Sequence, residues 1–178
     1  QLAAEGGYFL DPMCGSGTLV IEAALIASDA APGLLRDYWG FAGWAGHDAE
    51  LWQSLRTAAH ARVQPVTATP RIFGSDTDTR VLRAAEANAQ RAGVSARIHF
   101  GQCEVVDVRP PAGAARGLVA TNPPYGERLG DEAVARAAHE QLGTTLREHF
   151  SGWEAAVLTG AADGARAIGL RTYRTHEL

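Results

Sequence analysis

Short apolar runs alternate with amphipathic segments from one end of the chain to the other. Apolar runs of about four to eight residues predict buried strands, and apolar residues that recur every three to four positions predict helices. Strands that are apolar throughout are typical of a parallel sheet covered by helices on both faces. The alternation therefore predicts an α/β fold with an open, doubly wound, mostly parallel sheet. Strands are expected at 8–13, 71–76, 96–104, 117–122 and 153–160, and helices from 16, over 49–63, 79–93 and 132–149, and from 162.

Residues at the predicted helix ends follow known capping preferences. Ser16 or Thr18 is expected to cap the first helix through its hydroxyl. Asp78 is expected to cap the helix that begins at 79, and Gly93 to end it. The apolar face of the first helix is expected to comprise Leu19, Ala23 and Ile26.

Length and composition fit a single domain, 1–178, with an insertion at about 34–70. The net charge is −4 and all 16 basic residues are Arg, so overall charge does not favour a nucleic-acid binder that acts by positive charge alone. No apolar run approaches the ~18 residues of a membrane span, and Cys14 and Cys103 make no disulfide framework. We therefore expect a cytoplasmic protein with no membrane partner. The chain does not start with Met, so we expect a piece of a longer protein.

A glycine-rich turn, DPMCGSG, follows the first predicted strand. It lacks the Gly-Lys-Ser/Thr of a phosphate loop and the third glycine of the dinucleotide fingerprint. A carboxylate beside such a turn disfavours a pyrophosphate and favours a ligand with a cation or an ammonium group. S-adenosylmethionine has both, and we predict it as the cofactor; a plain strand-to-helix turn is the alternative. The predicted contacts are Asp11, Pro12, Cys14, Gly15, Ser16 and Gly17.

Acidic residues also follow the second and third predicted strands. Asp76 is expected to accept hydrogen bonds from the ribose hydroxyls, with Thr77 beside it in the same contact region. Glu104 is the expected acceptor for the adenine amino group, and Asp107 is the alternative. A solvated loop carboxylate remains an alternative for either of the last two.

The segment TNPPYGERLG follows the fourth predicted strand. Two consecutive prolines fix the backbone and hold Asn122 rigidly in an extended conformation. The side-chain carbonyl of Asn122 and the main-chain carbonyl of Pro123 can accept both N–H bonds of a planar amine, over the flat face of Tyr125. Accepting both bonds points the amine lone pair at an electrophile. The predicted catalytic set is Asn122, Pro123, Pro124 and Tyr125, and Asn122 is also a predicted cofactor contact. A Pro-Pro turn with Asn122 as a local cap is the alternative.

The segments DPMCGSGT and NPPYGERL together resemble the class I S-adenosylmethionine-dependent methyltransferases. With YWGFAGWAGHDAELW and GSDTDTRVLRAAEANAQRAG, nearly the whole chain is similar to the bacterial ribosomal RNA guanine-N2 methyltransferases of the RlmL type. Members of that family carry an N-terminal THUMP RNA-binding module, which is absent here, and have Asp where this chain has Glu104. The resemblance implies cofactor contacts at Asp11, Cys14, Gly15, Gly17, Asp76 and Glu104, and target-amine contacts at Asn122, Pro123, Pro124 and Tyr125.

The expected reaction is methyl transfer from S-adenosylmethionine to the exocyclic N2 of a guanine in 23S ribosomal RNA, helped by an RNA-binding module outside this chain. N6-adenine methylation of DNA, glutamine methylation of a protein, and a non-catalytic cofactor- or RNA-binding module are the alternatives. The guanine would be unpaired or flipped out of its helix.

Other polar and aromatic residues receive weaker predictions. No metal is expected, because His47 and Asp48 lie far in sequence from both cysteines. Glu127 and Arg128 either meet the substrate backbone or pair with each other. Core or lid packing is favoured over base stacking for Trp39, Phe41, Trp44 and Trp52.

Overall fold

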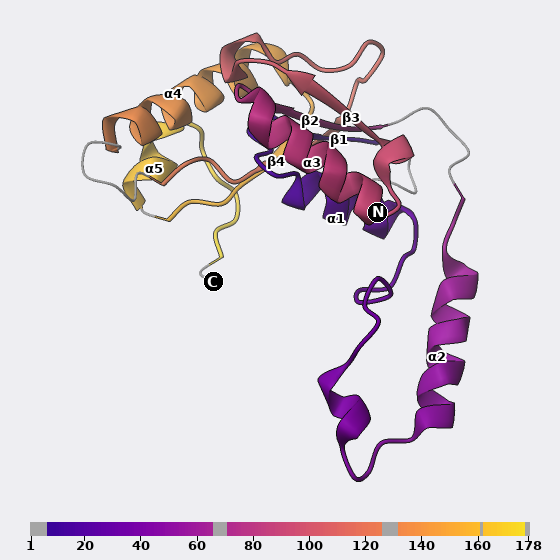
Figure 1. Ribbon diagram of the computed structural model, residues 1–178. Helices are drawn as coiled ribbons and strands as arrows, with labels where there is room; N and C mark the ends of the chain where they lie inside the picture. Colours follow the sequence, from indigo (N-terminus) through magenta and orange to yellow (C-terminus); the bar gives the residue numbers. More distant parts are fainter. Residues whose placement is uncertain (1–6, 66–70, 126–131, 161, 177–178) are drawn as a thin grey trace.

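The computed structural model describes residues 7–65, 71–125, 132–160 and 162–176. Its described part contains one five-stranded sheet in which all neighbouring strands are parallel. The strand order is β3-β2-β1-β4-β5 (Figure 1), which confirms the predicted doubly wound sheet. The strands are β1 (Tyr8–Asp11), β2 (Ile72–Asp76), β3 (Ile98–Gln102), β4 (Gly117–Thr121) and β5 (Glu154–Val157).

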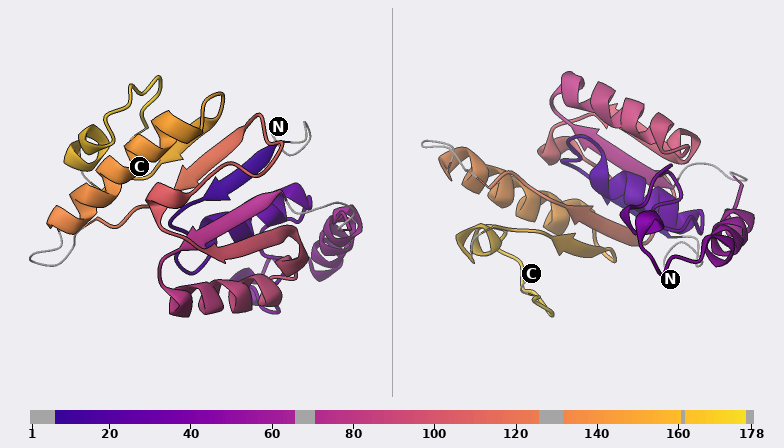
Figure 2. Two further views of the ribbon diagram at one scale, coloured as in Figure 1. Left: turned by 90° about the horizontal axis from the view of Figure 1, so that it is seen from above. Right: turned by 60° about the horizontal axis from the view of Figure 1, so that its bottom comes forward.

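Helices cover the sheet on both faces (Figure 2). Helices α1 (Thr18–Ala27) and α3 (Thr79–Arg91) lie on one face, and α4 (Glu132–His149) and α5 (Ala162–Ala167) lie on the other. Because successive strand side chains point to opposite faces, each face has its own core. The first core comprises Leu10, Val105, Val108, Val119, Leu142, Leu146 and Phe150, and the second comprises Val20, Ala24, Ile72, Ala89, Val94 and Ile98.

The strand order reverses between β1 and β4. From β1 the chain moves outward to β2 and β3, and it then returns to the other side of β1 to form β4 and β5. In sheets of this kind the loops at such a reversal diverge to opposite faces and leave a crevice at the carboxyl ends of the strands. Asp11 ends β1, and Asn122 directly follows β4, so the predicted residues lie at this switch point.

Two expectations about α1 are wrong. Its N-cap is Gly17, which makes no side-chain cap hydrogen bond, in place of Ser16 or Thr18. Its buried residues are Val20 and Ala24, while Ile26 of the expected apolar face is 74% exposed. Nearly every residue of this helix is apolar, so the sequence pattern does not determine which face is buried.

The caps of α3 are as predicted. The side chain of Asp78 accepts a hydrogen bond from the backbone N–H of Arg80 at 2.8 Å. Gly93, with a φ of 70°, follows the helix in the left-handed conformation that ends many helices.

Residues 33–65 form an arm that projects from the sheet (Figure 1). Helix α1 starts after the carboxyl end of β1 and runs back across the sheet, so the arm leaves at the amino ends of the strands. Its helix α2 (Ala49–Arg62) has no buried residue. Trp52 packs against Trp39 and Phe41, with ring centroids 5.1 and 4.9 Å apart. Trp39, Phe41 and Trp52 therefore pack on one another, and Trp44 is 72% exposed. None of the four belongs to either core, so the expectation of core packing is wrong, and lid packing stays a prediction.

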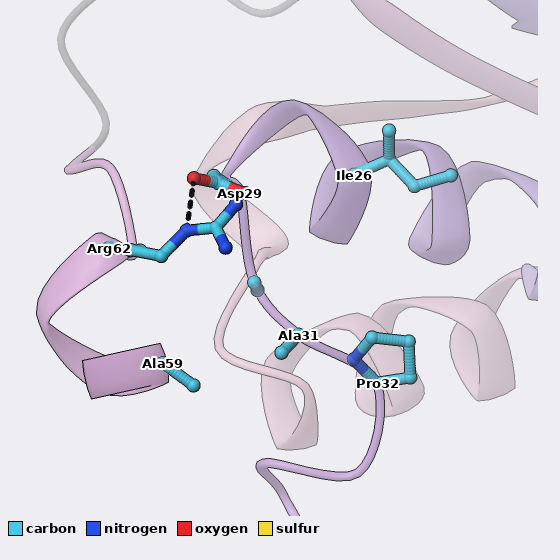
Figure 3. A pocket seen from close by; sticks show the side chains of 7 residues that line it. Ile26, Asp29, Ala31, Pro32, Ala59 and Arg62 are labelled. Atoms are coloured by element: carbon cyan, nitrogen blue, oxygen red, sulfur yellow. Dashed lines mark hydrogen bonds and ion pairs between the residues drawn. The ribbon is translucent and has the colours of Figure 1, made fainter. Parts of the chain in front are cut away.

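A hollow of about 340 Å³ lies at the base of the arm, between the ends of α1 and α2 (Figure 3). Arg62 bridges it by an ion pair of 2.6 Å with Asp29, and both side chains are largely exposed. The remaining lining is Ile26, Ala30, Ala31, Pro32 and Ala59. The hollow lies toward the amino ends of the strands, whereas Asp11 lies at the carboxyl end of β1. The hollow is therefore not the predicted site.

Candidate functional site at the carboxyl ends of the strands

The turn after β1 is held by backbone bonds and by glycine conformations. The Met13 N–H donates to Asp11 Oδ1 at 3.1 Å, and the Gly17 N–H donates to the Cys14 carbonyl at 2.8 Å. Gly15 and Gly17 have φ values of 52° and 88°, which residues with a side chain rarely adopt. Nothing lies within 4 Å of a Cβ built on Gly15, so the backbone there is open to a ligand.

Helix α3 and strand β2 approach the turn closely. A Cβ on Gly17 would lie 3.0 Å from the Ala85 Cβ, and Asn88 donates to the Ser16 carbonyl at 2.8 Å. A Cβ on Gly74 of β2 would lie 3.2 Å from the Cys14 sulfur. The glycine-rich sequence thus serves close packing as well as open backbone.

Asp76, at the end of β2, joins β2 to the glycine turn. Its Oδ2 accepts from the Gly15 N–H at 3.0 Å, and its Oδ1 accepts from the Asp78 N–H at 3.1 Å. Each carboxylate oxygen has two lone pairs, so one on each oxygen is left for a ligand hydroxyl. Asp76 therefore anchors the loop and can accept from a vicinal diol.

Asp11 is a buried carboxyl, only 2% exposed. Burial raises its pKa to about 6, and the charge of Asp76 adds to the rise. The nearby Thr121 hydroxyl and the Met13 N–H act in the opposite direction. The Thr121 hydroxyl influences this pKa but forms no hydrogen bond of good geometry, although its oxygen is fully buried. A buried anion with an unsatisfied hydroxyl beside it is suited to a cationic ligand.

The Cys14 thiol is not a nucleophile in this setting. Burial raises its pKa to about 12, and the charges of Asp11 and Asp76 act in the same direction. A thiol that stays protonated at neutral pH lacks the thiolate that covalent catalysis requires. Cys14 therefore packs in the turn beside Gly74.

The end of β3 is more open. Glu104 and Asp107 are both exposed, at the two ends of a short 3-10 turn. The backbone N–H of Cys103 donates to the Asp76 carbonyl at 3.2 Å, and Gln102 donates to the Thr77 carbonyl at 3.0 Å. These bonds tie the end of β3 to that of β2, but the choice of Glu104 over Asp107 stays a prediction.

Asn122, Pro123, Pro124 and Tyr125 follow β4 as one short segment. Pro123 is fully buried, whereas Asn122 and Tyr125 are exposed. The Tyr125 hydroxyl donates a hydrogen bond to Asn122 Oδ1. Glu127 and Arg128 lie outside the described residues.

The structure thus brings the glycine-rich turn with Asp11, the carboxylate of Asp76 and the strand end that carries Asn122 close together, whereas Glu104 lies on the exposed turn after β3. Asp11 and Asp76 interact with each other, and Asp11 interacts with Thr121, the residue before Asn122. Within the described ranges no three or more His, Cys, Asp or Glu side chains are arranged to hold a metal ion, and no helix there is long and apolar enough to span a membrane. Asp48 accepts from the Leu51 N–H at 2.9 Å and so caps α2.

A family model for the RMKL-like methyltransferase domain matches residues 3–178. The chain belongs to this family. Ribosomal RNA large subunit methyltransferase K/L of Syntrophotalea carbinolica is 50% identical over 181 residues, with 100% of this chain and 25% of that protein covered. The protein of the same name from Methylococcus capsulatus is 49% identical over 179 residues, with 100% and 24% covered. The chain therefore spans about a quarter of the length of these relatives.

Solved structures show the same fold. A methyltransferase complexed with S-adenosylhomocysteine has a TM-score of 0.81 and 31% identity, over 94% of this chain and 43% of its own. A Listeria monocytogenes protein, described as a predicted N6-adenine-specific DNA methylase, has a TM-score of 0.83 and 34% identity, over 97% and 44%. The fold of this RMKL-like domain is that of the class I methyltransferases, as expected.

Sequence reasoning missed three residues that shape the site of this RMKL-like domain. Thr121 lies beside Asp11, Gly74 makes room for Cys14, and Gly160 lies against Tyr125. Thr121 is a polar residue in an otherwise apolar strand, and that signal was available. Gly74 and Gly160 act through contacts with residues far away in the sequence, for which a single sequence carries no signal.

Proposed function

We propose that this domain transfers a methyl group from S-adenosylmethionine to the exocyclic N2 of a guanine in large-subunit ribosomal RNA. The observation that carries the proposal is that Asn122 and Pro123 directly follow Thr121, the last residue of β4, whose hydroxyl acts on the buried carboxyl of Asp11 at the end of β1. The two proposed acceptors for a planar amine, Asn122 Oδ1 and the Pro123 carbonyl, thus lie at the same switch point between β1 and β4 as the Asp11 carboxyl.

The acidic half of the site fits the cofactor. Asp11 would attract its positive charge, and Asp76 would accept from its ribose hydroxyls with the lone pairs left free by the two backbone bonds. Glu104, at the end of β3, would reach the adenine amino group. The remaining proposed contacts are backbone or close neighbours in the two turns: Pro12, Cys14, Gly15, Ser16, Gly17 and Thr77. The complex of a solved relative with S-adenosylhomocysteine supports this assignment.

The Asn122 segment would position the target. S-adenosylmethionine, when bound, supplies an electrophilic methyl carbon. Asn122 Oδ1 and the Pro123 carbonyl would accept the two N–H bonds of the guanine amine, and Pro124 restricts the backbone that carries them. Tyr125 would stack on the base after it leaves its helix. Catalysis in this account comes from orientation and from preorganised acceptors, and it requires no metal or covalent intermediate.

The names of the curated relatives support ribosomal RNA as the partner, although they do not specify the atom that is methylated. The negative net charge of this chain gives no general attraction to RNA. We therefore propose that an RNA-binding module outside this chain helps to bind the substrate, and that the reaction takes place in the cytoplasm.

N6-adenine methylation is the second candidate. Asn122 and Pro123 can accept the N–H bonds of any planar exocyclic amine, and the Listeria monocytogenes relative is described as a predicted DNA methylase of that specificity. The geometry of the acceptor pair alone does not separate guanine from adenine.

Product analysis tests the proposal. The protein would be incubated with labelled cofactor and either undermethylated 23S ribosomal RNA, double-stranded DNA or a glutamine-containing peptide, and the products would be identified by mass spectrometry. N2-methylguanosine from the RNA is the expected product. N6-methyladenine from DNA would replace the first proposal by the second, and methylglutamine would overturn both. Cofactor binding in calorimetry with no transfer to any substrate, even with the RNA-binding module present, would indicate a non-catalytic module.

A further inference from the structure

The Tyr125 hydroxyl occupies one of the two lone pairs of Asn122 Oδ1, the acceptor that the proposed function assigns to the target amine. It donates a hydrogen bond to Asn122 Oδ1. Asn122 is exposed and Tyr125 is 40% exposed, so the ring has solvent on one side. A target amine therefore meets a hydrogen bond that already exists.

Gly160, just beyond β5, provides the place where the Tyr125 ring rests. A Cβ on Gly160 would lie 3.1 Å from Tyr125 Cγ and 3.2 Å from Cδ1, which is closer than nine in ten real Cβ contacts. The φ of Gly160 is not in the left-handed region, so backbone conformation does not require glycine there. Space for the ring is the remaining physical reason for glycine at this position.

The sheet fixes the position of Gly160, which we call the seat of the Tyr125 ring, relative to Asn122. Thr121 of β4 is in register with Val157 of β5, and the Leu158 N–H donates to the Thr121 carbonyl at 3.0 Å. The pairing of β4 with β5 therefore continues to Thr121, directly before Asn122, and to Leu158, two residues before Gly160. A shift of the ring does not require a shift of the strands.

We propose that Tyr125 caps the Asn122 acceptor in the free enzyme and that Gly160 is the positioning residue that holds the cap. Entry of the target base exchanges the hydroxyl of Tyr125 for the amine of the base, and no covalent bond changes in this step. While the hydroxyl stays in place, an incoming amine finds one lone pair of Asn122 Oδ1 already used. This inference rests on the proposed role of Asn122.

Substitution of Tyr125 by Phe tests the cap. Tyr125→Phe keeps the ring and removes the hydroxyl, so the target no longer competes with an internal donor. The KM for undermethylated 23S ribosomal RNA is expected to fall by about three- to tenfold, the effect of one net hydrogen bond. Loss of a stacking or binding contact would instead raise KM, so an unchanged or higher KM overturns the proposal.

Coupling between Tyr125 and Gly160 tests the seat. In a Gly160→Ala background the ring is displaced, and the additional effect of Tyr125→Phe on KM is expected to disappear. Gly46→Ala is the matched control, because a Cβ there meets nothing within 4 Å and its φ is not left-handed. Full additivity of Gly160→Ala with Tyr125→Phe would contradict the proposed seat.

A measurement on the free protein needs no substrate. In NMR spectra with ¹³C-labelled tyrosine, the Tyr125 ring signal, assigned through Tyr125→Phe, should move in Gly160→Ala and in Asn122→Ala but not in Gly46→Ala. An unmoved signal in the first two variants overturns the cap. If transfer survives Asn122→Ala, the proposed function itself fails; if transfer is lost there but KM does not fall in Tyr125→Phe, only the cap fails.

Discussion

Asp11 combines almost complete burial with a second carboxylate nearby, and its protonation therefore affects the stability of the fold. Its pKa is raised from 3.8 to about 6, chiefly by burial. A carboxyl whose folded pKa is raised favours folding while it is protonated. That contribution is fully present below about pH 4 and is lost as the pH rises through about 6.

The substitution Asp11→Asn tests this effect. The amide keeps an acceptor for the Met13 N–H but has no charge to bury. The free energy of unfolding, measured by urea denaturation, should therefore be about 1–3 kcal/mol higher at pH 8 than that of the wild type. The gain should vanish at about pH 4, and cofactor binding should weaken in the variant. Asp37→Asn, at an exposed position, is the control and should show neither change. A variant that is less stable than the wild type at pH 8 would contradict the assigned cause of the pKa shift.

At the scale of elements, apolar runs predicted each described strand, and capping residues predicted most helix ends. Both kinds of signal are local in the sequence. Asp78 and Gly93 are examples in which the capping residue acts on its own helix. The start of α1 was not predicted correctly. Its cap is Gly17, where a Cβ would come too close to Ala85 of α3, a residue far away in the sequence. The packing of the arm on itself also escaped prediction, since aromatic residues alone do not specify their partners.

Two glycine substitutions separate backbone strain from packing. Gly17→Ala puts a methyl group at a φ of 88° and 3.0 Å from Ala85, and we expect a loss of about 2–4 kcal/mol in the free energy of unfolding. Gly93→Ala has a φ of 70° but meets nothing within 4 Å, so strain alone should cost about 1–2 kcal/mol. Equal losses in urea denaturation would mean that the contact between α3 and the turn does not constrain Gly17.

The arm provides a test of how far the cofactor half of the site is independent of the insertion. Trp52→Ala removes the ring that packs on both Trp39 and Phe41 and should loosen the arm. The arm leaves the sheet at the amino ends of the strands (Figure 1), far from the proposed cofactor contacts at their carboxyl ends. Cofactor affinity measured by calorimetry should therefore change less than about twofold, which is roughly the coupling found between distant mutations. A tenfold loss of affinity would show that the arm contributes to the site.

At the scale of the whole molecule, the topology explains how residues about 110 positions apart come to the same end of the sheet, where the proposed site lies. The reversal of strand order places the ends of β1 and β4 side by side, so the buried carboxyl of Asp11 and the proposed amine acceptor Asn122 follow neighbouring strands. The four motifs were visible in the sequence because each directly follows a strand. Their mutual contacts, such as that of Asp76 with Gly15, depend on strand order, which a list of elements does not determine.

The central claim is that the end of β4 handles the target amine while the ends of β1 and β2 hold the cofactor. Paired assays of Asn122→Ala test it most directly, with cofactor binding followed by calorimetry and methyl transfer followed on undermethylated 23S ribosomal RNA. Transfer should fall by about 10²- to 10³-fold, as it does when one preorganised catalytic contact is removed, while cofactor affinity changes by less than about threefold. Transfer at the wild-type rate would contradict the account.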